Sequence, residues 1–320
     1  MAVWFSHCHL YFQPEMQIQL LKRSEIDEEK WNLLVEKHGN GFPYAFSWYL
    51  DIVALKQWSA LVADNYKAIL PFCWNRKFGI PQIYHPSFTQ QLGIISGQAI
   101  SQEDFLIFLN GLPKKYWRIQ MTFNFKNQFD HHNFRKRANY CLSLSYPFEK
   151  IEENFAKNLN REINRAKKLG LKIGKPLSLN EHLNHFQKQM AIKKVKISAQ
   201  RMEILQQLLK TCLEKKKGLI KTVYGQNGEV LASTFLLDSP TRIINLILWS
   251  NLKGKQQFAS HFLLSEIMLA NANQDKVFDF EGSNIQTIAF FNRKFGAVDV
   301  PYLLFEKERF PINLIRKLKS

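Results

Sequence analysis

The chain has 320 residues, of which 46% are hydrophobic and 13% aromatic, and its 44 Lys and Arg against 27 Asp and Glu give a formal net charge of +17. This length fits two domains of ordinary size, and the aromatic content excludes a largely disordered protein. The basic surplus favours polyanionic or phosphorylated partners, because a positive surface concentrates anions, although such a surface also serves solubility alone.

The four cysteines are scattered and show neither metal-ligand nor CxxC spacing, so we expect reduced thiols in a cytoplasmic protein. The longest apolar stretches, 230–237 and 243–249, are of strand length and too short to span a bilayer. Residues 1–15 lack a basic n-region and a clean apolar run. We therefore expect an extension outside the fold there, such as one translated from an upstream start codon.

The first half is predicted to begin with helices and to continue with strands, because apolar residues recur first at helical spacing and then in alternation. Its elements are a strand at 17–22, helices at 28–38 and 46–55, strands at 60–63, 68–74 and 80–84, a helix at 102–109, and strands at 117–125 and 140–144.

The second half repeats this order of elements. They are helices at 149–169, 179–194 and 198–215 with a short strand at 171–173, a hairpin of strands at 219–224 and 230–237, a strand at 243–249, a helix at 258–271, a strand at 277–280, a helix at 285–294 and a strand at 300–305. We predict an α/β (α+β) protein of two domains, residues 16–147 and 148–320, with the boundary near Pro147.

The order of elements over residues 219–305 resembles the GNAT acyltransferase fold. Three segments resemble the second half of the Fem family, the tandem-domain ligases that lengthen peptidoglycan bridges: VLASTFLL, NLILWSNLKGKQQFASHFLLSEIMLANA and FDFEGSNIQTIAFFNRKFGA. NLNREINRAKKLGLKI is similar to the basic helix that opens that half. The resemblance covers most of Met16 to Lys307 and is sharp only in the C-terminal half.

This resemblance implies two GNAT-like domains, each a mixed, mostly antiparallel sheet flanked by helices, with the reactive cleft mainly in the C-terminal one. It implies acyl transfer from an aminoacyl-tRNA to a cell-wall precursor, UDP-linked or lipid-linked. The helix pair at 179–215 has no long coiled-coil arm for gripping tRNA. An acyl-CoA therefore stays open as the donor, and either donor would be a co-substrate and not a tightly bound cofactor.

A loop is predicted at residues 250–259, between a strand and a helix. Such a place offers backbone N–H groups and the positive end of a helix dipole to a phosphate. The segment resembles the pyrophosphate loop of the GNAT fold without its full Arg/Gln-x-x-Gly-x-Gly/Ala spacing, and an ordinary exposed loop is an equal alternative. The candidate donor-binding residues are Lys253, Gly254, Lys255, Gln257 and Ala259.

Asp279 and Glu281 end the apolar strand at 277–280. Alternation puts both carboxylates on one face, where burial and like charge raise one pKa toward the range of a general base for an attacking amine. We assign that role to Glu281 first and Asp279 second. The alternative for Asp279 is structural, as a helix cap or as the partner of Arg293 or Lys294.

Arg293 and Lys294 end the last helix, where the dipole alone favours cations. Their functional interpretation is that Lys294 stabilises a developing oxyanion and that Arg293 binds a donor phosphate. The helix at 149–169 puts Lys157, Arg161, Arg165 and Lys168 on one face. This face, with Arg161 and Arg165 as its central candidates, suits a diphosphate, a tRNA backbone or an anionic lipid surface, whereas a solvated basic face is the commoner outcome.

Tyr84 and His85 follow a strand of the first half and suit the rim of an acceptor pocket. His85 has the side chain for acid or base chemistry at neutral pH, although a lone loop histidine usually has neither role. The pair His131-His132 has no carboxylates at ligand spacing, so we expect no metal.

These observations predict an acyltransferase that joins an acyl or aminoacyl group to an amine by direct attack, without a covalent enzyme intermediate. Two alternatives stay open. One is an acyl-CoA-dependent N-acetyltransferase of a small molecule. The other is a non-catalytic protein on the same fold that binds RNA or contacts an anionic membrane peripherally, without a transmembrane segment.

Overall fold

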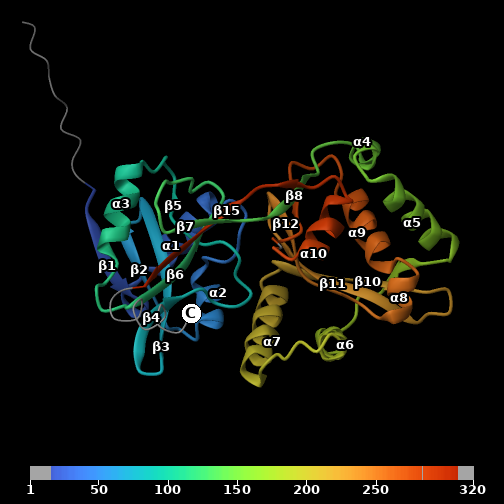
Figure 1. The fold of residues 1–320 in the computed structure, drawn as a ribbon, viewed down its shortest axis with the longest axis horizontal. Helices are drawn as coiled ribbons and strands as arrows, with labels where there is room; N and C mark the ends of the chain where they lie inside the picture. The colour runs from blue at the N-terminus through green and yellow to red at the C-terminus, as the bar shows by residue number, and fades with distance from the viewer. Residues whose placement is uncertain (1–15, 283, 309–320) are drawn as a thin grey trace, which may run out of the picture.

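The structure is a computed structural model that describes residues 16–282 and 284–308. Two mixed sheets lie side by side along the long axis of the molecule, each with helices against it (Figure 1). The predicted class, two mixed, mostly antiparallel sheets flanked by helices, is confirmed. None of the described helices is both long and apolar enough to cross a bilayer.

The first sheet is built mostly from the N-terminal half. In spatial order its strands are β1 (Ile18–Lys22), β2 (Trp58–Ala63), β3 (Ala68–Lys77), β4 (Ile80–Tyr84), β6 (Arg118–Phe123), β15 (Tyr302–Glu308) and β7 (Phe134–Arg137), with β5 (Ile95–Ser96) paired to β3. Its helices are the 3-10 turn η1 (Arg23–Glu25), α1 (Glu28–His38), α2 (Ser47–Val53) and α3 (Gln102–Gly111).

The second sheet is built mostly from the C-terminal half. Its strands, in spatial order, are β14 (Val298–Asp299), β8 (Tyr140–Ser143), β13 (Val277–Asp279), β12 (Arg242–Ser250), β11 (Val230–Asp238), β10 (Gly218–Tyr224) and β9 (Lys172–Gly174). Its helices are α4 (Phe148–Glu153), α5 (Lys157–Lys168), α6 (Leu179–Ile192), α7 (Ala199–Glu214), α8 (Leu252–Gln256), α9 (Ala259–Ala270) and α10 (Gln286–Arg293).

The two halves exchange strands. β8 comes from the end of the first half, yet it pairs with β13 and β14 in the second sheet. β15 comes from the end of the chain, yet it pairs with β6 and β7 in the first sheet. The sequence placed each of these strands in the other domain, because hydrophobic alternation shows that a strand exists and not which sheet it joins. The boundary near Pro147 stays a prediction.

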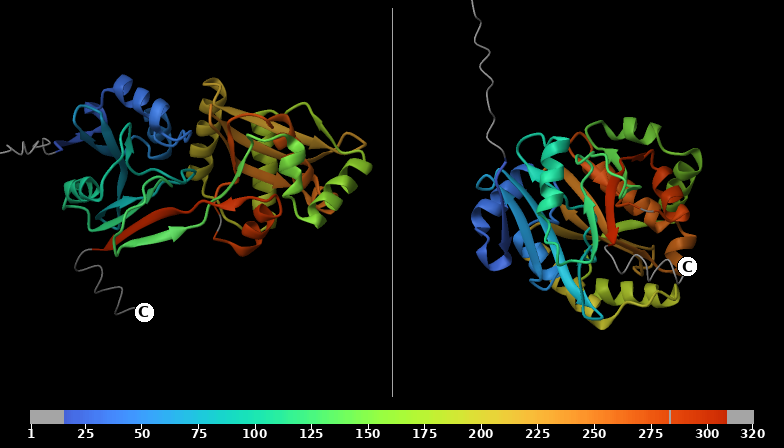
Figure 2. Two further views of the ribbon diagram at one scale, coloured as in Figure 1. Left: turned by 90° about the horizontal axis from the view of Figure 1, so that it is seen from above. Right: turned by 60° about the vertical axis from the view of Figure 1, so that its left-hand side comes forward.

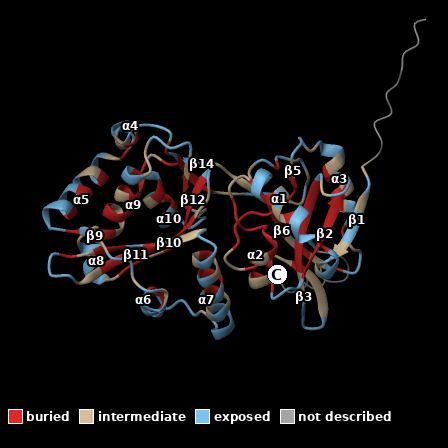
Figure 3. Ribbon diagram, turned by 180° about the vertical axis from the view of Figure 1, so that it is seen from behind, coloured by how far each residue is buried: buried red, intermediate tan, exposed pale blue. Residues whose placement is uncertain are grey.

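Three hydrophobic cores hold this arrangement together, and the buried residues line the inner faces of both sheets (Figure 3). One core lies between the first sheet and α3, and another between the second sheet and α5 and α9. The largest joins the two halves, since it includes Trp31 and Tyr49 of the first and Leu208 and Trp249 of the second. Apolar packing therefore holds the two halves together.

Local sequence explains where several helices begin. Asp27 accepts a hydrogen bond from Lys30 N at the start of α1, and Ser101 and Asp104 form a reciprocal capping box on α3. Ser198 caps α7, as its position in the sequence predicted. The helix predicted over 149–169 is instead two helices, α4 and α5, with a break at residues 154–156. The break directs Phe155 toward Phe295, with ring centroids 5.4 Å apart.

Each sheet contains one parallel pair of strands, β4 with β6 and β12 with β13. Both parallel pairs are short. Figure 2 shows the two sheets from two further directions. Residues 1–15, predicted to be an extension, lie outside the described residues.

Candidate functional site

The parallel strands β12 and β13 part shortly after they meet. Their ladder joins Arg242 to Val277, Ile243 to Phe278 and Ile244 to Asp279, and it has no further pair among the described residues, although β12 continues to Ser250. Two strands that diverge leave backbone N–H and C=O groups along the opening without ladder partners. Such groups are available to an extended ligand.

A β-bulge lies on β12 at the point where this opening begins. In the ladder with β11, Phe235 is opposite Ile247 and Leu236 is opposite Asn245, so Leu246 is the extra residue. A bulge leaves its extra residue out of the ladder and turns the local backbone to a new direction. The ladder between β11 and β12 is therefore interrupted close to the place where β12 and β13 separate.

Glu281 lies just beyond the end of β13 and has a left-handed backbone, with φ +57°. Its N–H donates to Asp279 Oδ1 over 2.9 Å, so the two carboxylates predicted from the sequence are joined by a tight turn. At Gly282 an added Cβ would be 1.9 Å from the carbonyl oxygen of Ala138, so only glycine lets the chain pass there. An uncommon backbone conformation held by its surroundings is a frequent feature of functional sites.

The Glu281 carboxylate accepts a hydrogen bond from Tyr44 Oη over 2.7 Å, and Tyr44 belongs to the first half. Burial raises the pKa of Glu281 to about 8, the Tyr44 hydrogen bond acts against the rise, and the charge of Asp279 acts with it. Burial also raises the pKa of the Tyr44 phenol well above its usual value, so this group stays a donor at neutral pH. The result is a carboxyl group that titrates near neutrality.

Asp279 is fully buried and forms an ion pair with Arg242, whose Nη1 lies 2.6 Å from Asp279 Oδ2. Asn139 Nδ2 donates to the same oxygen over 3.3 Å. The sequence analysis named Arg293 or Lys294 as the ion-pair partner of Asp279. In the structure the partner is Arg242. A buried carboxylate needs such donors, because its desolvation is costly without them.

Arg242 also connects the second half to the first. Its Nε donates to the carbonyl oxygen of Asn40 over 3.3 Å, and its guanidinium carbon lies 4.4 Å from the ring centroid of Phe42 and 5.3 Å from that of Phe125. Arginine stacks on aromatic rings while it keeps its planar hydrogen bonds. Arg242 thus joins a carboxylate next to Glu281 to the wall of a pocket.

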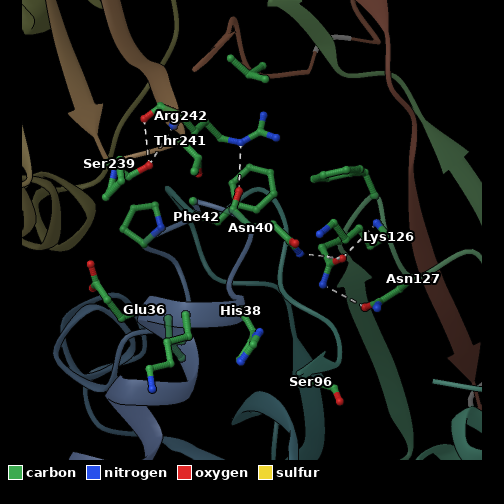
Figure 4. Close-up of a pocket in the computed structure, with 18 of the residues that line it drawn as sticks. Glu36, His38, Asn40, Phe42, Ser96, Lys126, Asn127, Ser239, Thr241 and Arg242 are labelled. Carbon is green, nitrogen blue, oxygen red and sulfur yellow. Dashed lines mark hydrogen bonds between the residues drawn. The ribbon is translucent and has the colours of Figure 1, made fainter. Parts of the chain in front are cut away.

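That pocket lies between the halves and has a volume of about 910 Å³. Figure 4 shows Arg242 and Asn40 on its wall, with Ser239 and Thr241 from the β11–β12 turn and Lys126 and Asn127 from the first half. Lys37 and Lys126 line it and form no ion pair with a described carboxylate. Hydroxyl, amide and ammonium groups together suit a polar ligand that carries negative charge.

The predicted loop at 250–259 is a short helix, α8, followed at once by α9. Asn251 Oδ1 accepts from Gly254 N over 2.7 Å, and the N–H groups of Lys255 and Gln257 donate to carbonyl oxygens of the same segment. The expectation of an open loop with free N–H groups is therefore wrong at these three positions. The binding role of the segment remains a prediction.

The other predicted donor-binding residues lie around α8. Lys253 pairs with Glu229, and Ala259 is the first residue of α9 and is buried. Phe258, between the two helices, has φ +59°, and no side chain caps α9 there. Arg165 of α5 has its guanidinium carbon 5.7 Å from the Phe258 ring centroid. The structure thus brings one predicted phosphate ligand beside the predicted donor segment.

The remaining predicted residues are placed elsewhere. Lys294 Nζ pairs with Glu162 over 2.9 Å, and Arg293 Nη1 donates to Tyr140 Oη over 3.2 Å. Arg161 is exposed on α5. Lys294 therefore has a structural partner on α5, and its catalytic role remains a prediction without support from the geometry.

Tyr84 is the last residue of β4 in the first half, and His85 directly follows it. His85 Nδ1 lies 3.2 Å from Thr122 Oγ1, and burial lowers the pKa of His85 to about 4. Its imidazole is neutral at neutral pH, so it is not poised to exchange a proton there. Among the described residues no three His, Cys, Asp or Glu side chains are grouped as metal ligands.

The sequence thus identified the two carboxylates and missed Tyr44, Arg242, Asn139 and the bulge. Tyr44 and Glu281 are 237 positions apart, so only the tertiary fold brings them together. One local feature could have drawn attention to Tyr44 as a site residue. It directly follows Pro43 in the segment between two predicted helices.

No model of a known protein family matches the sequence, and no curated protein is significantly similar to it. Solved structures do share its fold. FemX aligns with a TM-score of 0.68 at 10% identity, over 96% of this chain and 100% of its own.

Two further structures align over almost the same range. L-PGS from Bacillus licheniformis has a TM-score of 0.52 at 16% identity, over 90% of this chain and 95% of its own. The C-terminal domain of a putative lysylphosphatidylglycerol synthetase from Agrobacterium fabrum has a TM-score of 0.54 at 10% identity, over 88% and 92%. The chain therefore has the tandem fold of FemX and of these two proteins.

Proposed function

We propose that this protein is an acyltransferase that joins an acyl or aminoacyl group to an amine at the opening between β12 and β13. The observation that carries the proposal is Glu281, a carboxyl group with a pKa of about 8, held by Tyr44 beside that opening. A general base works best when its pKa is close to the working pH. The fold shared with FemX supports the reaction class by analogy.

In the proposed reaction Glu281 takes a proton from the ammonium group of the acceptor and leaves a neutral amine. The amine nitrogen then attacks the acyl carbonyl carbon, a C–N bond forms, and the C–S bond of a thioester or the C–O bond of an ester breaks. The nitrogen, positively charged after the attack, loses a second proton, and the leaving thiolate or alkoxide takes up that proton. In this proposal the backbone N–H groups near the Leu246 bulge stabilise the developing oxyanion.

Asp279 has a supporting role in this proposal. It accepts from Glu281 N and is itself neutralised by Arg242, so it fixes the backbone that carries the base. We therefore assign the proton transfer to Glu281 alone and treat Asp279 as a positioning residue. This ordering agrees with the preference drawn from the sequence.

We place the acceptor in the pocket between the halves. Its wall residue Arg242 binds Asp279, the carboxylate that adjoins Glu281, so the pocket and the proposed base share one hydrogen-bonded unit. The unpaired ammonium groups of Lys37 and Lys126 favour an acceptor that carries phosphate or carboxylate, such as a UDP-linked or lipid-linked cell-wall precursor. Lys126→Ala should raise KM for such an acceptor and leave kcat nearly unchanged.

The donor remains open between an acyl-CoA and an aminoacyl-tRNA. Arg165, Phe258 and Lys255 offer charge and an aromatic face near the start of α9, which fits the phosphates of either. Thermal unfolding in the presence of coenzyme A, acetyl-CoA, bulk tRNA and a UDP-linked precursor, each at low and moderate salt, separates them. A ligand bound by the native state alone raises Tm by mass action.

A salt-resistant rise in Tm with a coenzyme A species supports an acyl-CoA donor. A rise with tRNA and the precursor, and none with coenzyme A, supports the aminoacyl donor. With the donor known, Glu281→Gln should lower kcat by roughly 100-fold or more, the usual contribution of a general base. Glu214→Gln, which removes an exposed carboxylate paired to Lys210 on α7, is the control and should keep normal turnover. Full activity of Glu281→Gln would contradict the proposal.

A non-catalytic binding protein is the second candidate, and one observation favours it. Burial and the charge of Lys255 lower the pKa of Lys193, and neither lysine forms an ion pair with a described carboxylate. Uncompensated cations of this kind suit a polyanion. Tight, steeply salt-dependent RNA binding with no acyl transfer to any tested amine would support this candidate.

A further inference from the structure

The turn between β3 and β4 carries an aromatic side chain that projects into solvent. Phe78 is 92% exposed, and its backbone is left-handed with φ +52°, followed by Gly79 at φ +77°. Positive φ is uncommon for a bulky residue and costs free energy, and Asn or Asp serves such turns better. A single exposed apolar side chain is common in itself, but the unfavourable backbone at Phe78 has no packing reason within the described chain.

Cations flank this side chain. Lys77 Nζ lies 6.0 Å from the Phe78 ring centroid, and Arg76 Nη1 donates to the carbonyl oxygen of Gly79 over 3.0 Å. The tip of the hairpin therefore presents one aromatic ring between two positive charges. Neither cation forms an ion pair with a described carboxylate.

The loop between α6 and α7 repeats this combination of side chains. Ile192 is 69% exposed and Val195 is 49% exposed, and Lys193, Lys194 and Lys196 alternate with them and are also exposed. No described carboxylate pairs with these three lysines. Apolar and basic side chains thus alternate along a second protruding segment.

Both segments lie along one edge of the molecule. The β3–β4 turn and the α6–α7 loop are at the lower edge in Figure 1, in Figure 3 and in the right-hand view of Figure 2, three views related by rotation about the vertical axis. Arg201 near the start of α7 donates to Ser87 Oγ over 2.8 Å, which fixes this loop against the segment that follows β4.

The described chain also ends at this edge. Glu308 of β15 is opposite Arg118 of β6, and Arg118 is opposite Gln82 of β4, close to the β3–β4 turn. This edge therefore gathers positive charge from two separate parts of the described sequence, the β3–β4 turn and the α6–α7 loop.

We propose that this edge docks on the surface of an anionic phospholipid bilayer. Phe78, Ile192 and Val195 enter the boundary between headgroups and acyl chains, while the neighbouring lysines and arginines contact the lipid phosphates. A planar, deformable surface accommodates single apolar side chains on separate turns. A nucleic acid would bind the cations and stack on the Phe78 ring, but it would gain nothing from the exposed aliphatic side chains of Ile192 and Val195.

The proposal does not depend on the acyltransferase activity, because none of its residues belongs to the site around Glu281. Flotation with lipid vesicles tests it directly, with phosphatidylcholine alone and with a mixture of phosphatidylcholine and phosphatidylglycerol, each at low and moderate salt. We expect binding to the anionic vesicles only, and weaker binding as salt rises.

Substitutions at Phe78 and at one control position test the apolar part of the contact. Phe78→Ser should lower partition into anionic vesicles by about tenfold, since the loss of one partly inserted apolar side chain is of this order. Leu33→Ser removes an apolar side chain that is 53% exposed on α1, away from this edge, and should leave partition unchanged. Phe78→Leu should restore most of the binding, since leucine also inserts.

The cations give a second, independent readout. The triple variant Lys193→Gln, Lys194→Gln and Lys196→Gln should lower partition by roughly 100-fold at low salt, because each lysine near an anionic surface contributes about 1 kcal/mol. Lys67→Gln, at the opposite end of β3, is the control and should bind normally. All variants change exposed side chains, so unchanged Tm values confirm that they fold.

Binding that is lost equally in the Leu33→Ser and Phe78→Ser variants would overturn the proposal, as would the absence of vesicle binding by the unmodified protein. RNA binding that competes with the vesicles and depends on the three lysines but not on Phe78 would identify a nucleic-acid surface instead.

Discussion

The hydrogen bond between Tyr44 and Glu281 joins a side chain of each half within the proposed site. Because this bond opposes the rise in the pKa of Glu281, Tyr44→Phe should raise that pKa further. The ascending limb of the kcat/KM pH profile should then move to higher pH. Tyr49→Phe also removes a buried hydroxyl, which bonds to the carbonyl oxygen of Phe88, and should leave the limb in place.

The pKa of Glu281 also predicts how stability depends on pH. The carboxyl group of Glu281 has its usual pKa of 4.5 in the unfolded chain and a pKa of about 8 in the folded protein. Between these two pH values the folded protein keeps a proton that the unfolded chain has released, so the free energy of unfolding falls as pH rises. Burial lowers the pKa of three histidines from 6.5 to about 4: His85, His182 and His261. Between about pH 4 and pH 6.5 these histidines have the opposite effect, and the free energy of unfolding rises with pH.

The window from about pH 6.5 to 8 therefore isolates Glu281 from these histidines. Tm of the unmodified protein should fall across it, and Tm of Glu281→Gln should fall less. Equal slopes for the two proteins would show that Glu281 does not titrate there.

At the scale of single elements, α8 depends on the absence of a side chain at Gly254. An added Cβ would be 2.2 Å from the carbonyl oxygen of Leu231 on β11, so Gly254→Ala should cost about 2 kcal/mol by overpacking. At Gly111, the last residue of α3, a Cβ would meet only side-chain atoms, Leu61 Cδ1 at 3.2 Å and Ile18 Cγ2 at 3.7 Å, and no backbone, so Gly111→Ala should cost much less. Thermal or urea unfolding measures both changes. Equal stability of the two variants would contradict this packing.

Elements with a strong local signal were predictable from the sequence. The hairpin at 219–237 and the helix that begins after Ser198 match β10, β11 and α7 closely. α8 was not predicted, because a five-residue helix has little periodicity and its glycine suggested a loop. Asn251 at its start was the available signal, since asparagine is a good N-cap.

At the scale of the whole molecule, Arg242 forms a buried ion pair with Asp279 of its own half and also contacts Asn40 and Phe42 of the first half. Arg242→Met leaves Asp279 buried without its partner and should cost roughly 3–5 kcal/mol. Adding Asp279→Asn removes the uncompensated charge and should recover much of this loss. A double-mutant cycle by chemical unfolding measures the coupling, and additive losses would show that the pair is not a unit.

The sequence identified the carboxylate side of the site and not its partners. Asp279 and Glu281 belong to one motif, whereas Arg242 is 37 positions from Asp279 and Tyr44 is 237 positions from Glu281. Such pairings arise from sheet order and from the packing between halves, which hydrophobic periodicity does not encode. The same limit explains why the sequence identified β8 and β15 as strands but assigned each to the other domain.

The exchange of β8 and β15 makes the two halves inseparable folding units. A chain cut between β8 and α4 yields two fragments. Each lacks the strand next to one edge of its own sheet and holds a strand that belongs to the other sheet. Neither fragment completes its ladder until the two associate, so unfolding should occur as one cooperative event. If recombination replaced one half of the gene with the same half from a distant relative, it would also replace the strand that this half contributes to the other sheet. The two halves are therefore expected to evolve together.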